Sequence, residues 1–156
     1  KDYCKYDVLK NALNYRLSDI NCALGLSQLK KINFFIKKRK KIFETYVSEL
    51  KNFNSNLIIP NYSKNIKSSY HLFIINIIFD KLKKSKDHFI RYLNRNNIFP
   101  QYHYIPIHKF RIYDGKVFNF VGADKYFKCS ISLPIFVNLS LKEQRKIIKV
   151  IKKYFK

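Results

Sequence analysis

Residues 68–79 read SSYHLFIINIIF, and this stretch decides the class of fold that the sequence can adopt. It is rich in isoleucine and aromatic residues and is bounded by polar residues, which is typical of a buried strand. Helical patterns lie on both sides of it: an apolar stripe with a period near 3.6 runs from Ile32 to Leu50, and another helix is predicted over residues 87–97. Helices that flank a small, mainly antiparallel sheet make an α+β domain, which is the fold class we expect.

Shorter elements complete this pattern. The other predicted elements are strands at residues 57–60, 99–107 and 131–134, a loop at 109–122 and a short helix at 123–129. Pro106 stops the second of these strands, and Pro134 ends the third, which is expected to lie at an edge of the sheet. Ser140 and Glu143 have the spacing of a capping box, so a last helix is predicted from there to the end of the chain.

The segment NYRLSDINCALGLSQL, residues 14–29, places Asn14 and Arg16 immediately before an apolar helix. Ser18 is a good helix cap, and the helix is predicted to run to residue 31. Cys22 falls within its apolar pattern and is predicted to be a small buried hydrophobe. Two strong polar groups ahead of such a helix indicate a more specific role than packing.

The balance of charge admits two explanations. The chain has 32 Lys and Arg against 10 Asp and Glu, a formal net charge of +22. A basic surface attracts phosphate backbones, which favours nucleic-acid binding. The abundance of lysine, isoleucine, asparagine, phenylalanine and tyrosine is also what an AT-rich genome produces, so the lysines are equally explained as solvated surface positions. We do not expect specific nucleic-acid binding.

Composition also gives expectations about the cellular compartment of the protein and about whether the chain is complete. Its three cysteines are far apart and form no CxxC pair, which favours a reduced, cytoplasmic protein over a disulfide or zinc scaffold. There is no apolar run of about 18 residues, so no membrane span is expected. The absence of methionine means that Lys1 is not a retained initiator. We therefore expect the chain to be a fragment that lacks an N-terminal region.

The segment QYHYIPIH, residues 101–108, carries the other candidate residues, His103 and His108. Their odd separation puts them on opposite faces of a regular strand, and no ligand of suitable spacing accompanies them, so no metal site is predicted. Three glycines are too few for a glycine-rich phosphate loop, and no nucleophile elbow is present. The residues alone therefore indicate a basic α+β domain with a polar cluster.

Four segments together resemble a known family. NYRLSDINCALGLSQLKKI, SSYHLFIINI, QYHYIPIH and ADKYFKCSISLPIF occur in the order and at the approximate distances found in the DegT/DnrJ/StrS family of sugar-nucleotide aminotransferases. These enzymes use pyridoxal phosphate (PLP) and have the aspartate aminotransferase type of fold. The resemblance covers essentially all of residues 1–156, but only the C-terminal small domain of a family protein. It implies that residues 1–17 are an interface loop and that the large PLP-binding domain is absent.

The resemblance also implies roles for individual residues. In the family, the asparagine that matches Asn14 helps to hold the PLP phosphate of the neighbouring subunit in a homodimer. Arg16 is then a nearby substrate or anion contact. His103, Tyr104 and His108 match the segment that approaches the nucleotide-sugar. The family usually has glycine at the position of Ala12, a departure that would strain the loop if a positive φ is needed there.

Within the family, the first and third segments are most similar to the transaminases of pseudaminic acid synthesis, which aminate a UDP-linked 4-keto-6-deoxy sugar with glutamate as donor. The lysine that forms the aldimine with PLP, and the aspartate that pairs with its ring nitrogen, belong to the large domain and have no counterpart here. We therefore expect an enzyme as the parent protein and an inactive fragment. The alternatives are a degenerate remnant that acts as an interaction module and a basic nucleic-acid-binding domain.

Overall fold

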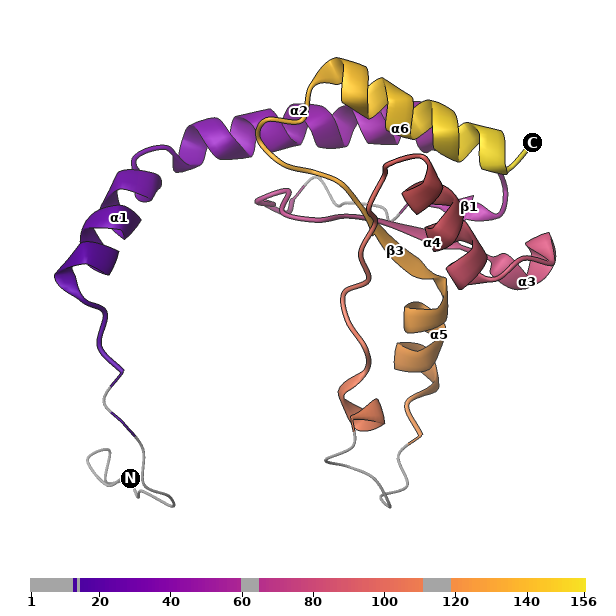
Figure 1. Ribbon diagram of the computed structural model, residues 1–156, viewed down its shortest axis with the longest axis horizontal. Helices are drawn as coiled ribbons and strands as arrows, with labels where there is room; N and C mark the ends of the chain where they lie inside the picture. Colours follow the sequence, from indigo (N-terminus) through magenta and orange to yellow (C-terminus); the bar gives the residue numbers. More distant parts are fainter. Residues whose placement is uncertain (1–12, 14, 60–64, 111–118) are drawn as a thin grey trace. The chain divides into compact units, whose positions relative to one another are not determined.

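The computed structural model describes residues 13, 15–59, 65–110 and 119–156. Asn14 and Ala12 lie outside the described residues, as does the middle of the predicted loop at 109–122. The chain divides into two compact units, residues 1–33 and residues 34–156 (Figure 1). We describe each unit by itself.

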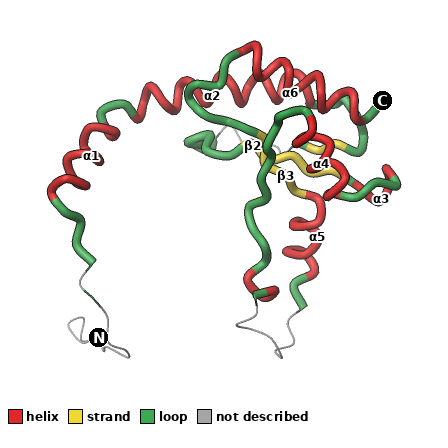
Figure 2. Tube along the Cα trace, in the orientation of Figure 1, coloured by secondary structure: helices red, strands yellow, loops and turns green. Residues whose placement is uncertain are grey.

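The second unit is built on a three-stranded antiparallel sheet in the order β1-β2-β3. Its strands are drawn in yellow in Figure 2. The strands are β1 (Leu57–Ile58), β2 (Phe73–Ile77) and β3 (Ser130–Leu133). Strand β2 is central, with Phe73 opposite Leu133 on one side and Ile77 opposite Leu57 on the other. This sheet confirms the predicted strand within residues 68–79 and the predicted edge strand at 131–134.

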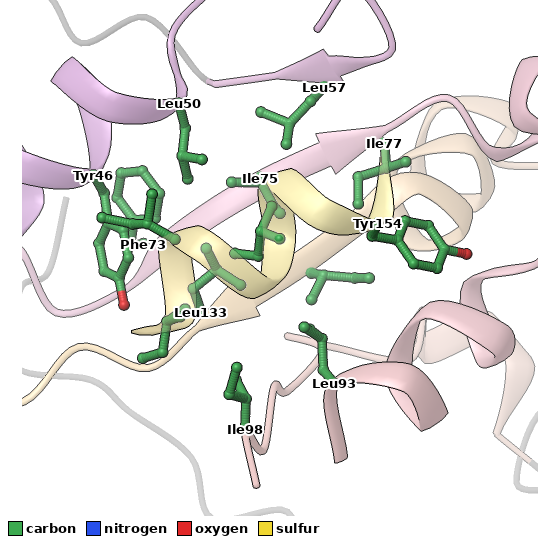
Figure 3. Close-up of a cluster of buried hydrophobic side chains, with 14 of the residues drawn as sticks. Tyr46, Leu50, Leu57, Phe73, Ile75, Ile77, Leu93, Ile98, Leu133 and Tyr154 are labelled. Carbon is green, nitrogen blue, oxygen red and sulfur yellow. The ribbon is translucent and has the colours of Figure 1, made fainter. Parts of the chain in front are cut away.

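One face of the sheet is covered by helices that bury its alternate side chains. The helices are α2 (Ile32–Leu50), α4 (Lys86–Arg95) and α6 (Leu141–Tyr154). Phe73, Ile75 and Ile77 of β2 are completely buried, and the ring of Tyr46 from α2 stacks on Phe73 with centroids 4.7 Å apart (Figure 3). Because apolar residues from three helices and the sheet share one cluster, this cluster is the hydrophobic core of the unit.

Polar contacts fix the ends and the register of these helices. Ser140 and Glu143 form the predicted capping box at the start of α6. Buried Gln144 of α6 donates from Nε2 to the carbonyl oxygen of Ile42 in α2, at 2.7 Å. Helices α2 and α6 therefore lie side by side, as Figures 1 and 2 show. A short helix, α3 (Phe79–Leu82), follows β2 and was not predicted.

Helix α5 (Val121–Cys129) leads directly into β3 and also contacts β2. It confirms the helix predicted at 123–129 but begins earlier, so Gly122 is helical instead of part of a loop. Residues 101–110, which precede this helix, contain a 3-10 turn, η1 (Ile107–Lys109), and Asp124 in the first turn of α5 contacts that turn.

The predicted strand at 99–107 is wrong. Only Gln101 pairs with the sheet, through one isolated antiparallel bridge to Ser132 of β3. Pro100 precedes this bridge and Pro106 follows it, and neither has a backbone N–H to donate. The segment is therefore irregular after Gln101, so its side chains do not point alternately to the two faces of the sheet as those of a strand do.

In the first unit, α1 (Asp19–Leu29) begins as predicted at Ser18, whose side chain accepts from the backbone N–H of Asn21 at 3.3 Å. The prediction that Cys22 is buried is wrong, because no residue of α1 is buried and Cys22 is exposed. The leucines and the isoleucine of α1 are all at least 60% exposed. None of the helices in the described ranges is long and apolar enough to span a membrane.

Candidate functional site

The segment from Gln101 to Phe110, here called the histidine segment, carries three of the predicted site residues. Figures 1 and 2 show it running alongside α5, with η1 as its only regular turn. It is held at two places, one on β3 and one on α5, and a histidine lies at each of them.

His103 lies at the first anchor. Its Nδ1 atom is 2.8 Å from the hydroxyl oxygen of Ser132, whose backbone is also bridged to Gln101 by two hydrogen bonds of 2.7 and 3.0 Å. Ser132 is buried, and it alternates along β3 with Ile131 and Leu133 of the core, so it lies on the opposite face of the sheet. The ring is therefore held by Nδ1, and its Nε2 atom has no hydrogen bond to any residue that the structure describes.

His108 lies at the second anchor. Its Nε2 atom is 3.2 Å from Oδ1 of Asp124 on α5, and Nζ of Lys109 is 2.7 Å from the same oxygen. The ring of His108 also lies against Phe120, with centroids 5.2 Å apart. The hydrogen bond and charge of Lys109, with a smaller contribution from His108, lower the pKa of Asp124 below its ordinary value. Because its side chain is only 12% exposed, His108 holds the segment in place more than it presents itself to a ligand.

Tyr104 and Arg16 are presented to solvent. Tyr104 is 75% exposed and touches the ring of His103 edge-on, with centroids 4.7 Å apart. Arg16 is exposed in the first unit, just ahead of α1. The structure thus brings His103 and Tyr104 together and places His108 at a separate anchor. Asn14 lies outside the described residues.

A hollow of about 560 Å³, here called the β3–α6 hollow, opens beside His103. Its walls are the residues that precede β2, the chain after α4, the end of β3 and the first turns of α6. The polar residues in these walls include His71, Gln101, His103, Ser132, Glu143 and Lys146. Neither Tyr104 nor His108 lines the hollow, so the predicted substrate residues are only partly grouped around it.

Several residues of this site were not singled out from the sequence, among them Ser132, Asp124 and Lys146. Ser132 and Asp124 lie within the quoted segment ADKYFKCSISLPIF, but their sequence distances from the histidines do not indicate contact. Lys146 lies on a helix crowded with lysines, so nothing in its local sequence distinguishes it. Folding alone brings these side chains to the histidine segment and to the hollow.

The described residues include an exposed anion-binding group, Arg16 of the first unit, but no metal-binding cluster. Among the described residues, no group of three His, Cys, Asp or Glu side chains is placed to hold a metal ion. The exposed guanidinium of Arg16 offers the planar donors that phosphate and carboxylate groups prefer, so this residue fits the phosphate-bearing cofactor implied by the resemblance.

A small antiparallel sheet with helices on its core face makes this an α+β domain, as predicted. The solved structures that it matches are aminotransferases, one of them in a PLP form, which confirms the predicted PLP-dependent transferase type of fold. The chain belongs to the DegT/DnrJ/EryC1/StrS aminotransferase family, whose model matches residues 2–152.

Individual relatives agree with this assignment. A UDP-4-amino-4,6-dideoxy-N-acetyl-beta-L-altrosamine transaminase of Campylobacter jejuni is 33% identical over 144 residues, which cover 89% of this chain and 37% of that protein. The structure of Helicobacter pylori PseC, described as an aminotransferase involved in the biosynthesis of pseudoaminic acid, matches with a TM-score of 0.82 at 31% identity, over 99% of this chain and 42% of its own.

A Streptococcus pneumoniae structure, described as that of a sugar aminotransferase in the PLP form, matches with a TM-score of 0.78 at 25% identity, over 96% of this chain and 38% of its own. The chain therefore spans about two fifths of the length of the proteins that it resembles.

Proposed function

We propose that the chain is the C-terminal small domain of a PLP-dependent sugar-nucleotide aminotransferase, with residues 1–17 as a loop at a homodimer interface. The observation that carries this proposal is the family match across residues 2–152. The chain covers about two fifths of each relative, which fits one domain of a larger enzyme.

The proposed reaction is the transfer of an amino group from glutamate to a UDP-linked 4-keto-6-deoxy sugar. The C. jejuni relative is named as a transaminase of a UDP-linked amino sugar, and the H. pylori protein is described as involved in the biosynthesis of pseudoaminic acid. An identity near one third supports the same class of acceptor for this chain. The proposal places the protein in the synthesis of a surface-glycan sugar.

The residues of this chain bind and orient in the proposed reaction. Asn14 donates to the cofactor phosphate of the partner subunit, and Arg16 contacts an anionic group nearby. His103 and Tyr104 face the nucleotide-sugar, while His108 acts through the segment that it anchors on Asp124. When bound, PLP supplies the electron-withdrawing ring through which the amino group passes from donor to acceptor.

The chain alone is proposed to be inactive, because the lysine that binds PLP belongs to the large domain. Two observations test the proposal together. The reading frame upstream of Lys1 should continue into a large domain with that lysine. The complete gene product should then transfer ¹⁵N from labelled glutamate to a UDP-linked keto-sugar in the presence of PLP, as followed by NMR. A stop codon in that frame, or a complete protein that transfers no label to any 4-keto-6-deoxy nucleotide-sugar, would refute it.

A further inference from the structure

The β3–α6 hollow gathers potential donors from three separate parts of the chain. Lys146 comes from α6, His71 from the residues before β2, and His103 from the histidine segment. Lys146 is exposed and forms no ion pair within the described part of the chain. His103 is held by Nδ1 on Ser132, which leaves Nε2 as the ring atom for a ligand. An ammonium group and two imidazoles form a set that suits an anion.

Among the described residues that line the hollow, the one carboxylate already accepts hydrogen bonds from donors of its own helix cap. Oε2 of Glu143 accepts from the backbone N–H of Ser140 at 2.9 Å and from its hydroxyl at 2.6 Å. These two hydrogen bonds lower the pKa of Glu143 and direct its charge to the start of α6. Glu143 therefore serves the helix cap, and Lys146 remains available to a ligand.

The hollow also offers flat apolar surface. Phe99 and Phe136 both line it, and they are 69% and 47% exposed, although rings of this size are usually covered. Nucleobases stack on exposed aromatic rings, because every base presents a π-face. The combination of aromatic rings with a cationic side chain is a common way to hold a nucleotide.

We propose that the β3–α6 hollow binds a phosphate-type anion through Lys146, His71 and His103. The assignment of this anion to the diphosphate of a nucleotide-sugar, with its base on Phe99 or Phe136, rests on the proposed function. Lys146 and His71 are then specificity residues for the nucleotide half of the acceptor. Inorganic phosphate or pyrophosphate offers the same chemistry, so the test separates the two sources.

Calorimetric titration of the chain with UDP, inorganic pyrophosphate and uridine tests the proposal. UDP should bind more tightly than pyrophosphate, and uridine should bind least. Lys146→Met should lower the affinity for UDP and for pyrophosphate at least about tenfold, because it removes a charge-assisted hydrogen bond. The matched control is Lys149→Met, one turn later on α6 and outside the hollow, which should change binding by less than about twofold because it removes only a screened distant charge.

The histidines supply a second measurement that does not depend on the variants. In NMR spectra of the imidazole nitrogens, UDP should shift the signals of His71 and His103 but not of His88, which bonds Tyr154 away from the hollow. An equal loss of affinity in Lys146→Met and Lys149→Met would show attraction by overall charge only and overturn the proposal. Uridine that binds as tightly as UDP, or histidine signals that do not move, would overturn it too.

The proposal and the proposed function can fail separately. If the chain binds UDP in this way but the complete gene product transfers no amino group, the proposed function fails and the hollow stands. If the complete enzyme is active and Lys146→Met leaves its KM for the nucleotide-sugar unchanged, the hollow fails and the proposed function stands.

Discussion

Oδ1 of Asp124 lies 3.2 Å from Nε2 of His108 and 2.7 Å from Nζ of Lys109, so one carboxylate joins the histidine segment to α5. We predict that Asp124→Ala releases this anchor. Amide hydrogen exchange of residues 107–110 should accelerate, while exchange in β2 should not change. Asp124→Asn should have a smaller effect, since an amide oxygen still accepts from His108. Unchanged exchange at 107–110 in Asp124→Ala would show that the contact does not hold the segment.

The same anchor should depend on pH in one direction. Lys109, with a smaller contribution from His108, lowers the pKa of Asp124 in the folded protein. The stabilisation is therefore fully present above the ordinary aspartate value of about 3.9 and is lost as the pH falls through the lower folded value. Protection of residues 107–110 should decline only in that acidic range, and Asp124→Asn should not show the decline.

Ser132 of β3 is predicted to position the ring of His103 through a hydrogen bond. Ser132→Ala removes the hydroxyl that lies 2.8 Å from Nδ1 and should cost about 0.5–1.5 kcal/mol in the free energy of unfolding. A double-mutant cycle with His103→Ala, measured by urea unfolding, isolates this interaction. The two substitutions should be coupled by a similar amount. Fully additive effects would mean that the serine and the histidine act independently.

The core prediction concerns Phe73, which is fully buried between Tyr46 and Phe43, with ring centroids at 4.7 and 5.0 Å. Phe73→Ala should lower the free energy of unfolding by about 3–5 kcal/mol, because it removes a large buried ring and leaves a cavity. Phe34→Ala provides the matched control. Phe34 is 54% exposed on α2, so its substitution should lower the free energy of unfolding by less than about 0.5 kcal/mol. Similar losses in the two variants would contradict this description of the core.

The elements that could be predicted from the sequence are those with a strong local signal. Ser18 and Ser140 cap helices where their spacing indicates, and the alternating residues of β2 are buried as a strand beside a core should be. The prediction of burial failed in α1, where no residue of an apolar helical pattern is buried among the described residues of its unit. Cys22 has an apolar helical neighbourhood, yet burial depends on what covers the helix, and no described residue of its unit does so.

The candidate site was less predictable because its contacts join distant residues. The histidine segment resembles a strand in composition, but Pro100 and Pro106 confine its pairing to Gln101. The contacts of His103 and His108 reach 29 and 16 residues along the chain, to side chains with no motif of their own. Local patterns cannot encode such distances, whereas the family resemblance pointed to the segment without showing what holds it.

Asn14 is proposed to serve the active site of the partner subunit. In the complete enzyme, Asn14→Ala should weaken PLP binding by about 1–3 kcal/mol, the cost of leaving a charged acceptor without its hydrogen bond. Each homodimer of this variant, or of a variant that lacks the PLP-binding lysine, has two defective sites. A mixed dimer of the two variants would instead hold one site with both defects and one with neither.

The decisive measurement is therefore the transaminase activity of purified mixed dimers, made with two different affinity tags. We predict that about half of the wild-type activity per dimer returns, because one complete site forms from residues of both subunits. Mixed dimers that demonstrably assemble and yet remain as inactive as the parent variants would contradict it, since Asn14 would then act within its own subunit or not at the cofactor.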